Sequence, residues 1–383
     1  MLVQYPVLLL LIIGRVLTKV NSVTTERTSR PLIIGHRGAP GIYPENTLPG
    51  YRQAIADHAD YIECDVFPTK DRKLVCLHDP YLSPITDVAN RTEFADRRRT
   101  MFVPDYGQHD DWFLFDFTLD ELKTLRLKQR DSFRDQSHNG KYPLTSFDEY
   151  VQVAKNAGRP VGIYPEIKLP ELINDQPFMN GTRIEDIFLD SLKRHGYTKR
   201  NDLCFVQSFS EEALRYIKGK TELRLVMMVW LEEHIRGPNL NESKIDEWSE
   251  MYYGFGAWKP QIVNYYDDEN GYKNWIGSET GLIQEVLRTG LKFHVYTFRN
   301  EDRYLAWDFK QDPINEYLYF DQLGDIEAYF TDFPGTMYRA FEERYGRHPT
   351  DSTCPTNVAG PARPWLASQI ITFMAMIVRQ FVR

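Results

Sequence analysis

Cysteine is scarce in this chain of 383 residues, which contains only four. No two of them form a C-x-x-C pair, so the sequence does not support a structural zinc site or thioredoxin-type chemistry. Four cysteines are also too few for a fold that depends on disulfides, and a chain with 42% hydrophobic residues can form a large core without them. The low cysteine count therefore does not argue against secretion.

The chain also lacks a long basic tract. Its formal net charge is −8, and the densest group of positive charges is Arg97, Arg98 and Arg99, which we interpret as part of a solvated face. Because nucleic-acid binding needs a basic surface, we expect no nucleic-acid partner. The sequence has no fixed-period repeat and no low-complexity segment.

The N-terminal apolar run, Val7–Ile13, is too short to span a bilayer. Val20-Asn21-Ser22 fits a cleavage site, so we predict a signal peptide over residues 1–22. A membrane-proximal anchor that is never cleaved is the alternative. We expect a secreted glycoprotein, because the sequence also contains three Asn-x-Ser/Thr sequons, at Asn90, Asn180 and Asn241.

The C-terminal tail, residues 346–383, contains a second apolar stretch, Trp365–Val378. Small residues and a polar spacer precede it, in the order typical of a signal for a glycosylphosphatidylinositol anchor. A short membrane-associated helix and a helix packed on the domain are the competing interpretations. The tail is therefore a candidate for membrane attachment, which would hold a secreted protein at the cell surface.

Short apolar segments alternate with helical patterns over residues 31–345, which is typical of a parallel sheet. Amphipathic runs such as Leu48–Ala59 lie between the strands. Eight strands predict a (β/α)8 (TIM) barrel, although a further candidate near Ile262 leaves the count open. The eight strand candidates are Leu32–Ile34, Tyr61–Val66, Leu74–Leu77, Val161–Ile167, Leu203–Val206, Leu223–Val229, Phe293–Phe298 and Ala328–Phe330.

The alternation is interrupted between Asp79 and Tyr142, where there is no clean strand–helix unit. A structureless loop of that length is improbable inside a compact domain. We therefore predict a small insertion subdomain over about residues 80–142, after the third strand and over one end of the barrel. It includes the aromatic and acidic stretch Asp110–Asp116.

Glu63 and Asp65 are two residues apart on a predicted strand, so alternation places both carboxylates on one face and Cys64 on the other. Two acids inside a barrel need something to neutralise them, because an unpaired buried charge is costly. Two carboxylates directed at one point suit Ca²⁺ or Mg²⁺. Taken alone, the pair is better explained as a solvated, salt-bridged strand end.

Glu166 and Lys168 repeat this pattern at the end of another predicted strand. A third carboxylate and a positive charge fit the surroundings of a metal and a phosphate, while a simple ion pair is the alternative. His36 ends the first predicted strand and His78 the third. Because barrel strands converge at one mouth, two histidines there suit the roles of general acid and general base, and Arg37 could bind phosphate oxygens.

These residues lie in motifs that resemble the signature of the glycerophosphodiester phosphodiesterases. The resemblance extends over roughly residues 31–340, and the spacing between His78 and Glu166 is similar to that of the bacterial periplasmic branch. The motifs are Gly35-His36-Arg37-Gly38-Ala39, Pro44-Glu45-Asn46-Thr47, Glu63-Cys64-Asp65, His78-Asp79, Pro165-Glu166-Ile167-Lys168, Gln207-Ser208-Phe209, Val295-Tyr296-Thr297 and Thr331-Asp332-Phe333-Pro334.

The resemblance implies a TIM barrel with a small insertion. It assigns one divalent cation to Glu63, Asp65 and Glu166, and the acid–base roles to His36 and His78. Arg37 and Lys168 would bind the phosphate, and Tyr296 would line the glycerol or leaving-group pocket. Glu45 and Asn46 would brace their loop, and we interpret Asp332 as a turn or capping residue and His294 as structural.

The expected activity is the hydrolysis of small-molecule glycerophosphodiesters to sn-glycerol 3-phosphate and an alcohol. A lysophospholipase D or sphingomyelinase-D-like enzyme on the same barrel is the nearest alternative, and an apolar rim near residues 112–117 would favour it. An inactive surface binding protein is a further alternative, which a metal titration with an activity assay would separate. An extracellular setting favours Ca²⁺ over Mg²⁺. Attack by water or through a cyclic phosphate, and the division of acid and base roles, stay open.

Overall fold

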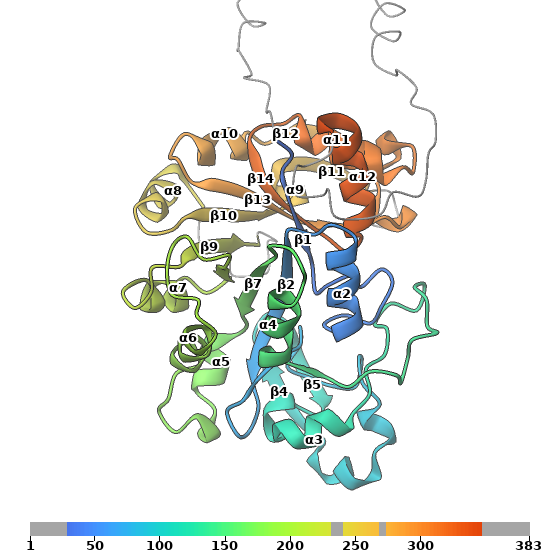
Figure 1. Ribbon diagram of the computed structural model, residues 1–383, viewed down its shortest axis with the longest axis vertical. Helices are drawn as coiled ribbons and strands as arrows, with labels where there is room; N and C mark the ends of the chain where they lie inside the picture. The colour runs from blue at the N-terminus through green and yellow to red at the C-terminus, as the bar shows by residue number, and fades with distance from the viewer. Residues whose placement is uncertain (1–28, 231–239, 268–272, 347–383) are drawn as a thin grey trace, which may run out of the picture. The chain divides into compact units, whose positions relative to one another are not determined.

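The structure is a computed structural model and describes residues 29–230, 240–267 and 273–346 (Figure 1). The predicted signal peptide and the apolar C-terminal stretch lie outside these residues. Within the described ranges, no helix combines the length and apolar character needed to cross a bilayer.

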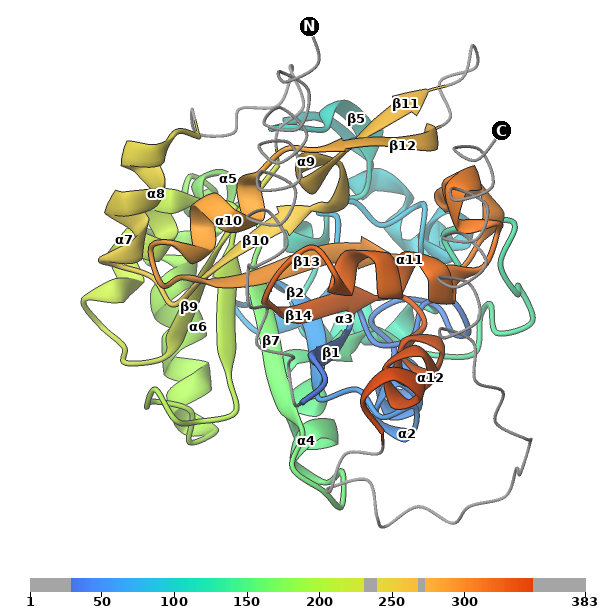
Figure 2. The same ribbon diagram turned by 90° about the horizontal axis from the view of Figure 1, so that it is seen from above.

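Eight parallel strands form a closed barrel, which confirms the predicted TIM fold (Figure 2). The barrel closes because β1 pairs with β14 on one side and with β2 on the other. The strands, in spatial order, are β1 (Leu32–Gly35), β14 (Ile326–Thr331), β13 (Lys292–Phe298), β10 (Gly254–Trp258), β9 (Arg224–Val229), β8 (Phe205–Ser208), β7 (Gly162–Ile167) and β2 (Tyr61–Pro68).

Helices follow the strands and cover the barrel from outside (Figures 1 and 2). The first begins at Thr47, whose side chain accepts a hydrogen bond from the backbone N–H of Gly50, so Thr47 and not Asn46 caps it. These helices are α2 (Leu48–Ala56), α4 (Phe147–Lys155), α5 (Pro170–Asn174), α6 (Ile184–Arg194), α7 (Glu211–Lys218), α8 (Glu242–Ser249), α9 (Lys259–Ile262), α10 (Leu282–Leu287), α11 (Pro313–Asp321) and α12 (Pro334–Tyr345).

Alternation along the strands divides the core into two layers. Ile62 and Val66 of β2 point outward and pack in the large cluster beneath the helices. Tyr61 of β2 and Tyr164 of β7 point inward, with Phe205 and Phe330, into a separate aromatic cluster inside the barrel. This inner layer fills the lower part of the barrel, and the acidic side chains on the inward faces of β2 and β7 lie near the carboxyl ends of these strands.

Two of the expected strands are not as the sequence predicts. The segment predicted as Leu74–Leu77 is β3 (Leu74–Cys76), which runs antiparallel to β2 and lies outside the closed barrel. The missing barrel strand is β10, and the candidate near Ile262 starts the hairpin of β11 (Val263–Asp267) and β12 (Lys273–Glu279). β10 carries Gly256 facing inward because Met228 fills that space: a Cβ there would lie 2.2 Å from the Met228 sulfur.

Between β3 and the short strand β6 (Thr145–Ser146), the chain forms the segment predicted as an insertion. It contains an antiparallel hairpin, a helix and short 3-10 turns, and it occupies the lower end of Figure 1. We call it the insertion. Its elements are η1 (Val88–Asn90), η2 (Thr92–Arg97), β4 (Arg99–Val103), β5 (Gly107–Asp111), η3 (Leu114–Asp116) and α3 (Leu119–Thr124).

The aromatic stretch of the insertion packs as part of the large hydrophobic cluster that also contains the outward residues of the barrel strands. Trp112, Phe113, Leu114, Phe115 and Phe117 are all buried. They therefore do not form the apolar rim that would favour a lysolipid substrate.

The arginines at residues 97–99 lie over aromatic rings of this stretch. Arg97 lies over the ring of Phe117, and Arg99 lies over that of Phe113. The same guanidinium groups pair with Glu121 and Asp116, so these side chains pack against the insertion as well as facing solvent.

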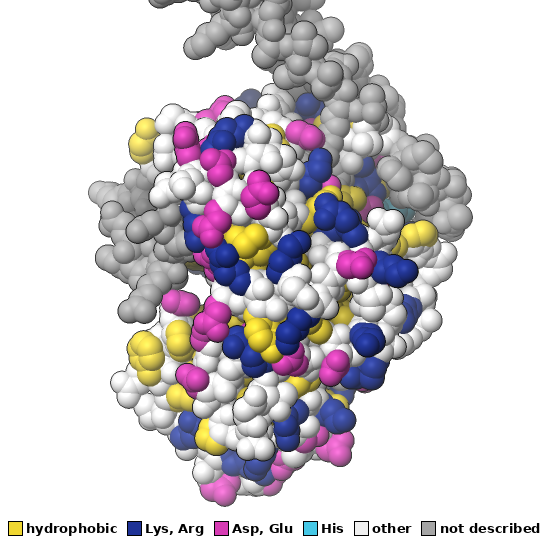
Figure 3. All heavy atoms as spheres, turned by 90° about the vertical axis from the view of Figure 1, so that its left-hand side faces the viewer, with side chains coloured by type: hydrophobic (Ala, Val, Ile, Leu, Met, Phe, Trp, Pro, Cys, Tyr) yellow, Lys and Arg dark blue, Asp and Glu magenta, His cyan; other side chains and the backbone are white. Residues whose placement is uncertain are grey.

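The remaining short turns lie in the loops after β7 and β13: η4 (Pro177–Met179), η5 (Asp302–Tyr304) and η6 (Trp307–Phe309). Figure 3 shows the face on the left of Figure 1, where positive and negative side chains are interspersed. Arg215 of α7, for example, pairs with Glu211 on its own helix and with Glu247 of α8.

Candidate metal centre and active site

Three buried carboxylates meet inside the mouth of the barrel. One oxygen from each of Glu63, Asp65 and Glu166 lies within 4.8 Å of the others. β2 provides the first two from adjacent inward positions, and β7 provides the third directly beside Asp65. The register of two neighbouring parallel strands thus brings the three predicted metal ligands together.

The electrostatics of this cluster fit a divalent cation. Burial, together with the neighbouring charge of Asp65, raises the pKa of Glu63 well above its usual range. Burial also raises the pKa of Glu166 to about 7, because pairing with Lys168 only partly offsets it. A divalent cation would stabilise all three groups in the ionised form, and oxygen ligands are the kind that Ca²⁺ and Mg²⁺ take.

A side-chain amide lies beside the carboxylates. The amide Nε2 of Gln207, on β8, donates to Glu63 Oε1 at 3.5 Å. Within the described part of the chain, its buried Oε1 has no hydrogen-bond partner. A side-chain amide can adopt either orientation, so Gln207 could present this oxygen to a bound ion. The sequence contained Gln207 in a family motif, but its chemistry gave no reason to assign it a role.

His36 follows β1 and lies at the barrel mouth. Its Nδ1 lies 2.6 Å from Asp332 Oδ1, at the end of β14. The next residue, Arg37, donates its backbone N–H to Glu63 Oε2 at 2.6 Å, which ties His36 to the acidic cluster. Burial and the charge of Arg37 lower the pKa of His36, although Asp332 acts in the opposite direction.

His78 reaches the same mouth by a different route. β2 extends beyond the barrel to Pro68, and β3 returns beside it. The backbone N–H of Leu77 then donates to the Asp65 carbonyl oxygen at 2.9 Å, which brings His78 level with the acids. Burial, with Arg37 and Lys168, lowers the pKa of His78 to about 4. Its Nδ1 lies 2.6 Å from Asp79 Oδ1.

The two predicted phosphate-binding cations lie against the carboxylates. Lys168 Nζ is 3.1 Å from Glu166 Oε1 and 3.8 Å from Asp65 Oδ1. Arg37 Nε is 3.4 Å from Asp65 Oδ2, and its NH1 donates to Glu45 Oε2 at 3.1 Å. Both cations therefore border the acidic cluster, where they balance part of its negative charge.

The turn at residues 36–38, which places His36 and Arg37 at the barrel mouth, contains two residues with positive φ angles. Arg37 has a φ of 52° and Gly38 a φ of 90°. A Cβ at Gly38 would lie 2.8 Å from the backbone of Gly50, so the glycine allows α2 to approach this turn closely. Asn46 donates to Asp65 at 3.4 Å and accepts from the Tyr51 hydroxyl, and in this way it braces the acid.

Tyr296, predicted to line a substrate pocket, forms part of an aromatic wall beside the acids. Its hydroxyl donates to the Val229 carbonyl oxygen at 2.6 Å, so the ring and not the hydroxyl is available to a ligand. Its ring lies near those of Phe209 and Trp230, and Trp230 stacks on Trp258 with centroids 4.8 Å apart. His294 lies deeper, between Tyr164 and Glu327, in a structural position.

The insertion contributes a further aromatic residue to the rim. Tyr106 lies in the turn between β4 and β5, with its ring centroid 6.5 Å from that of His78. Burial raises the pKa of Tyr106, and Lys168, Asp79 and Glu166 also act on it, which places the hydroxyl close to the cluster. The sequence offered no signal for this contact, because a hairpin tip far along the chain meets the barrel mouth.

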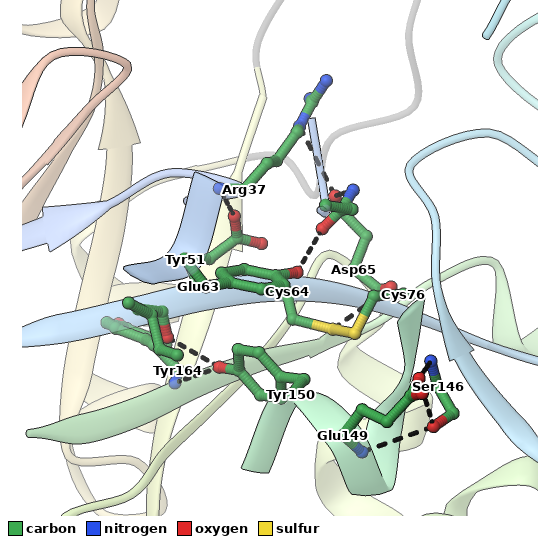
Figure 4. The surroundings of a disulfide bond; sticks show 12 residues. Arg37, Tyr51, Glu63, Cys64, Asp65, Cys76, Ser146, Glu149, Tyr150 and Tyr164 are labelled. Carbon is green, nitrogen blue, oxygen red and sulfur yellow. Dashed lines mark hydrogen bonds and ion pairs between the residues drawn. A yellow bond between two sulfur atoms is a disulfide. The ribbon is translucent and has the colours of Figure 1, made fainter. Parts of the chain in front are cut away.

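A disulfide joins Cys64 to Cys76 on the outer side of β2 (Figure 4). Cys64 lies between the metal-ligand candidates Glu63 and Asp65, and Cys76 lies two residues before His78. The bond therefore connects the strand that carries two acids to the strand that carries a histidine. This pairing was not predicted from the sequence, although two cysteines on neighbouring strands are a signal for it.

A model of the glycerophosphoryl diester phosphodiesterase family matches residues 36–336. The chain is 39% identical over 328 residues to glycerophosphodiester phosphodiesterase GDPD6 of Arabidopsis thaliana, covering 82% of this chain and 86% of that protein. It is 29% identical over 355 residues to a glycerophosphodiester phosphodiesterase of Haemophilus influenzae, covering 82% and 91%.

Solved structures share the fold. A phosphodiesterase of Oleispira antarctica in complex with the product sn-glycerol-3-phosphate superposes with a TM-score of 0.55 at 20% identity, covering 82% of this chain and 97% of that one. A glycerophosphodiester phosphodiesterase of Agrobacterium tumefaciens superposes with a TM-score of 0.51 at 18% identity, covering 81% and 100%. At these identities the likeness supports the barrel alone.

Proposed function

Because this chain belongs to the glycerophosphoryl diester phosphodiesterase family, we propose that it hydrolyses glycerophosphodiesters to sn-glycerol 3-phosphate and an alcohol with one divalent cation and two histidines. The observation that carries the cation and histidine roles is the cluster of three carboxylates within 4.8 Å of one another. The backbone of the residue next to each histidine is hydrogen-bonded to a member of that cluster.

The cation would be held by Glu63, Asp65 and Glu166, with the amide oxygen of Gln207 as a further candidate ligand. When bound, it would offset charge on the phosphate and make a hydroxyl or water easier to deprotonate. Ca²⁺ rather than Mg²⁺ is our choice, since the proposed location is extracellular and oxygen-rich sites accept Ca²⁺ with flexible geometry.

Arg37 and Lys168 would then bind the phosphate. In the described structure both are engaged by carboxylates. Once those carboxylates have a divalent partner, the guanidinium and ammonium groups can turn part of their hydrogen-bonding capacity to phosphate oxygens. Their positive charge would stabilise the negative charge that develops in the transition state.

The two histidines would transfer the protons. Each ring uses Nδ1 toward an aspartate, so Nε2 is the atom left for the substrate. One Nε2 takes the proton of the attacking oxygen, which belongs to water or to a glycerol hydroxyl of the substrate, a new P–O bond forms, and the bond to the leaving alcohol breaks. The other Nε2 gives that alcohol its proton. After attack by the glycerol hydroxyl, a water molecule then opens the cyclic phosphate to give sn-glycerol 3-phosphate. The negative phosphodiester favours the protonated form of the ring that acts as the acid.

We also infer that the protein functions outside the cell or at its surface. The proposal is supported by the disulfide between Cys64 and Cys76, since such bonds persist in oxidising compartments. The asparagines of all three sequons, Asn90, Asn180 and Asn241, are exposed, as glycosylation requires.

The test is product analysis on a panel of glycerophosphodiesters and lysolipids, with chelator and with each divalent ion added back. We expect sn-glycerol 3-phosphate from the glycerophosphodiesters, loss of activity on chelation, and recovery with Ca²⁺. Release of products from lysolipids only, or full activity in chelator, would contradict the proposal.

A further inference from the structure

Behind each histidine lies the same arrangement of an aspartate and an arginine. We call His36, Asp332 and Arg134 the His36 triad, and His78, Asp79 and Arg130 the His78 triad. In both triads one carboxylate oxygen faces the histidine Nδ1 and the other faces the arginine. Both arginines come from residues 125–144, the segment in which the insertion returns to β6.

In the His36 triad, Arg134 NH2 donates to Asp332 Oδ2 at 2.7 Å, and its Nε donates to Glu301 at 2.6 Å. Arg134 is buried, with 4% of its side chain exposed. A second guanidinium, that of Arg299 at the end of β13, donates to the same Asp332 oxygen at 2.9 Å. Asp332 therefore has two positive partners besides His36.

In the His78 triad, Arg130 is the single arginine on Asp79 among the described residues. It donates to Asp79 Oδ2 and also to both oxygens of Glu45, at 2.7 and 2.9 Å. Glu45 in turn accepts from Arg37, the predicted phosphate ligand. One insertion residue thus connects the support of His78 to that of Arg37.

These arginines have a definite effect on the proton of the imidazole. Burial acts to raise the pKa of both aspartates, but the arginines and histidines beside them lower it well below the usual range. A carboxylate that stays ionised can only accept a hydrogen bond, so it holds the ring proton on Nδ1 and fixes the ring orientation. Nε2 is then directed to the substrate, with its lone pair free in the ring that acts as the base and with a second proton on it in the ring that acts as the acid.

We propose that Arg130 and Arg134, supplied by the return segment of the insertion, are positioning residues that each set one histidine of the acid–base pair. The inference deepens the proposed function, because it assumes that His36 and His78 exchange protons with the substrate. It gives the insertion a role in turnover that is separate from covering the barrel mouth. The two triads should also differ in how much activity is lost when one arginine is removed, since Arg299 supports only Asp332.

The test compares two substrates that differ in the leaving group. An alkyl diester of glycerol phosphate needs a proton on the departing oxygen, whereas a p-nitrophenyl diester does not. Loss of the acid therefore reduces kcat for the alkyl substrate and has little effect on the p-nitrophenyl substrate. Loss of the base reduces kcat for both. His36→Ala and His78→Ala establish which pattern belongs to which histidine.

We expect each arginine variant to reproduce the pattern of the histidine that it serves. Arg130→Met should lower kcat by roughly 10- to 100-fold with the His78 pattern, and any change in KM through Glu45 and Arg37 should be smaller. Arg134→Met alone should have a smaller effect, because Arg299 stays on Asp332. The double variant Arg134→Met/Arg299→Met should approach the loss of Arg130→Met, with the His36 pattern. Arg130→Lys, which keeps the charge, should recover part of the activity.

The control is Arg97→Met, which also removes a two-point ion pair from the insertion, that with Glu121, but contacts neither aspartate. It should leave kcat unchanged for both substrates. Calcium titration and melting curves on every variant show whether the fold and the acidic cluster are intact. If Arg130→Met does not fold, Arg130→Lys must still show a smaller defect with the His78 pattern.

The inference is wrong if the arginine variants change only KM, lose kcat equally in both triads with the same leaving-group pattern, or behave like Arg97→Met. These outcomes leave the proposed function standing as long as the histidine variants are inactive. Normal turnover in both histidine variants would instead remove the proposed function, and this inference with it.

Discussion

The two histidines of the site are held by different regions of the molecule. His36 and its aspartate both follow strands of the barrel, β1 and β14, which pair directly. His78 and its aspartate follow β3, which lies outside the barrel and is joined to β2 by hydrogen bonds and a disulfide. The barrel thus provides one half of the acid–base pair, which we call the barrel half. The antiparallel pair of β2 and β3, with the insertion that follows it, provides the other half, which we call the hairpin half.

This difference shows that a closed barrel is not sufficient to complete the site. The acidic cluster and His36 need only the register of barrel strands, whereas His78 depends on the return of β3 to the level of Asp65. Arg130 and Arg134 then connect the insertion to both halves. The half built on the barrel should therefore tolerate changes in the insertion better than the half built on the hairpin.

The largest effect is expected when either histidine is removed, and it tests whether both halves are necessary for turnover. His36→Ala and His78→Ala should each lower kcat by roughly 10²- to 10⁴-fold, because each removes a proton-transfer group. Steady-state kinetics measure the loss, and calcium titration should show nearly unchanged affinity in both variants. A variant with normal turnover would exclude its histidine from the chemistry.

A smaller effect is expected when only the partner of each histidine changes. Asp79→Asn and Asp332→Asn should lower kcat by roughly 10- to 100-fold, because an amide can donate to Nδ1 and turn the ring proton toward Nε2. Asp332→Asn should also lower the melting temperature more, since it leaves Arg134 and Arg299 without their shared carboxylate. Equal melting temperatures would remove this asymmetry between the halves.

The acidic cluster that both halves share should bind its cation in a pH-dependent way. Glu166 has a pKa of about 7 without the cation, so below that pH the ion must displace its proton. Apparent affinity should rise with pH up to at least pH 7, by up to about tenfold per pH unit for each proton that the ion displaces. Calorimetry in buffers of different ionisation enthalpy should detect released protons. A flat affinity between pH 5 and 7 would contradict the raised pKa.

The disulfide should matter more for the hairpin half than for the barrel half. The double variant Cys64→Ala/Cys76→Ala should lose about 2–4 kcal/mol of unfolding free energy, because the crosslink no longer restricts the unfolded chain. Denaturant unfolding measures this loss. We expect a further decrease of a few-fold in kcat with the leaving-group pattern of His78→Ala, because β3 is no longer held to β2. A decrease in kcat with the leaving-group pattern of His36→Ala would contradict the assignment of the disulfide to the hairpin half.

The sequence predicted those parts of the site that depend on local patterns. Alternation places Glu63 and Asp65 on one face of β2, and the family resemblance indicates Glu166 and both histidines. The pattern of apolar residues could not identify β10, because Gly254 and Gly256 occupy inward positions where an apolar run would be expected. β3 is short and apolar, so its sequence pattern predicts a barrel strand although it lies outside the barrel.

The supporting contacts carried no local signal. Arg130 is 51 residues from Asp79, and Arg134 is 198 residues from Asp332. Such pairs depend on how the insertion returns over the barrel, which neither periodicity nor charge spacing predicts. Asp332, interpreted as a turn or capping residue, has two arginines and His36 as its side-chain partners.

The disulfide also has a consequence for the order of events during biosynthesis. Cys64 and Cys76 are only 12 residues apart and completely buried in the finished protein. An oxidoreductase can reach their sulfurs only before the helices pack over them, and the pairing needs no residue beyond position 76. The crosslinked hairpin can therefore form while most of the chain is still being synthesised. A recombinant host that delivers the chain to an oxidising lumen is the appropriate source of native enzyme.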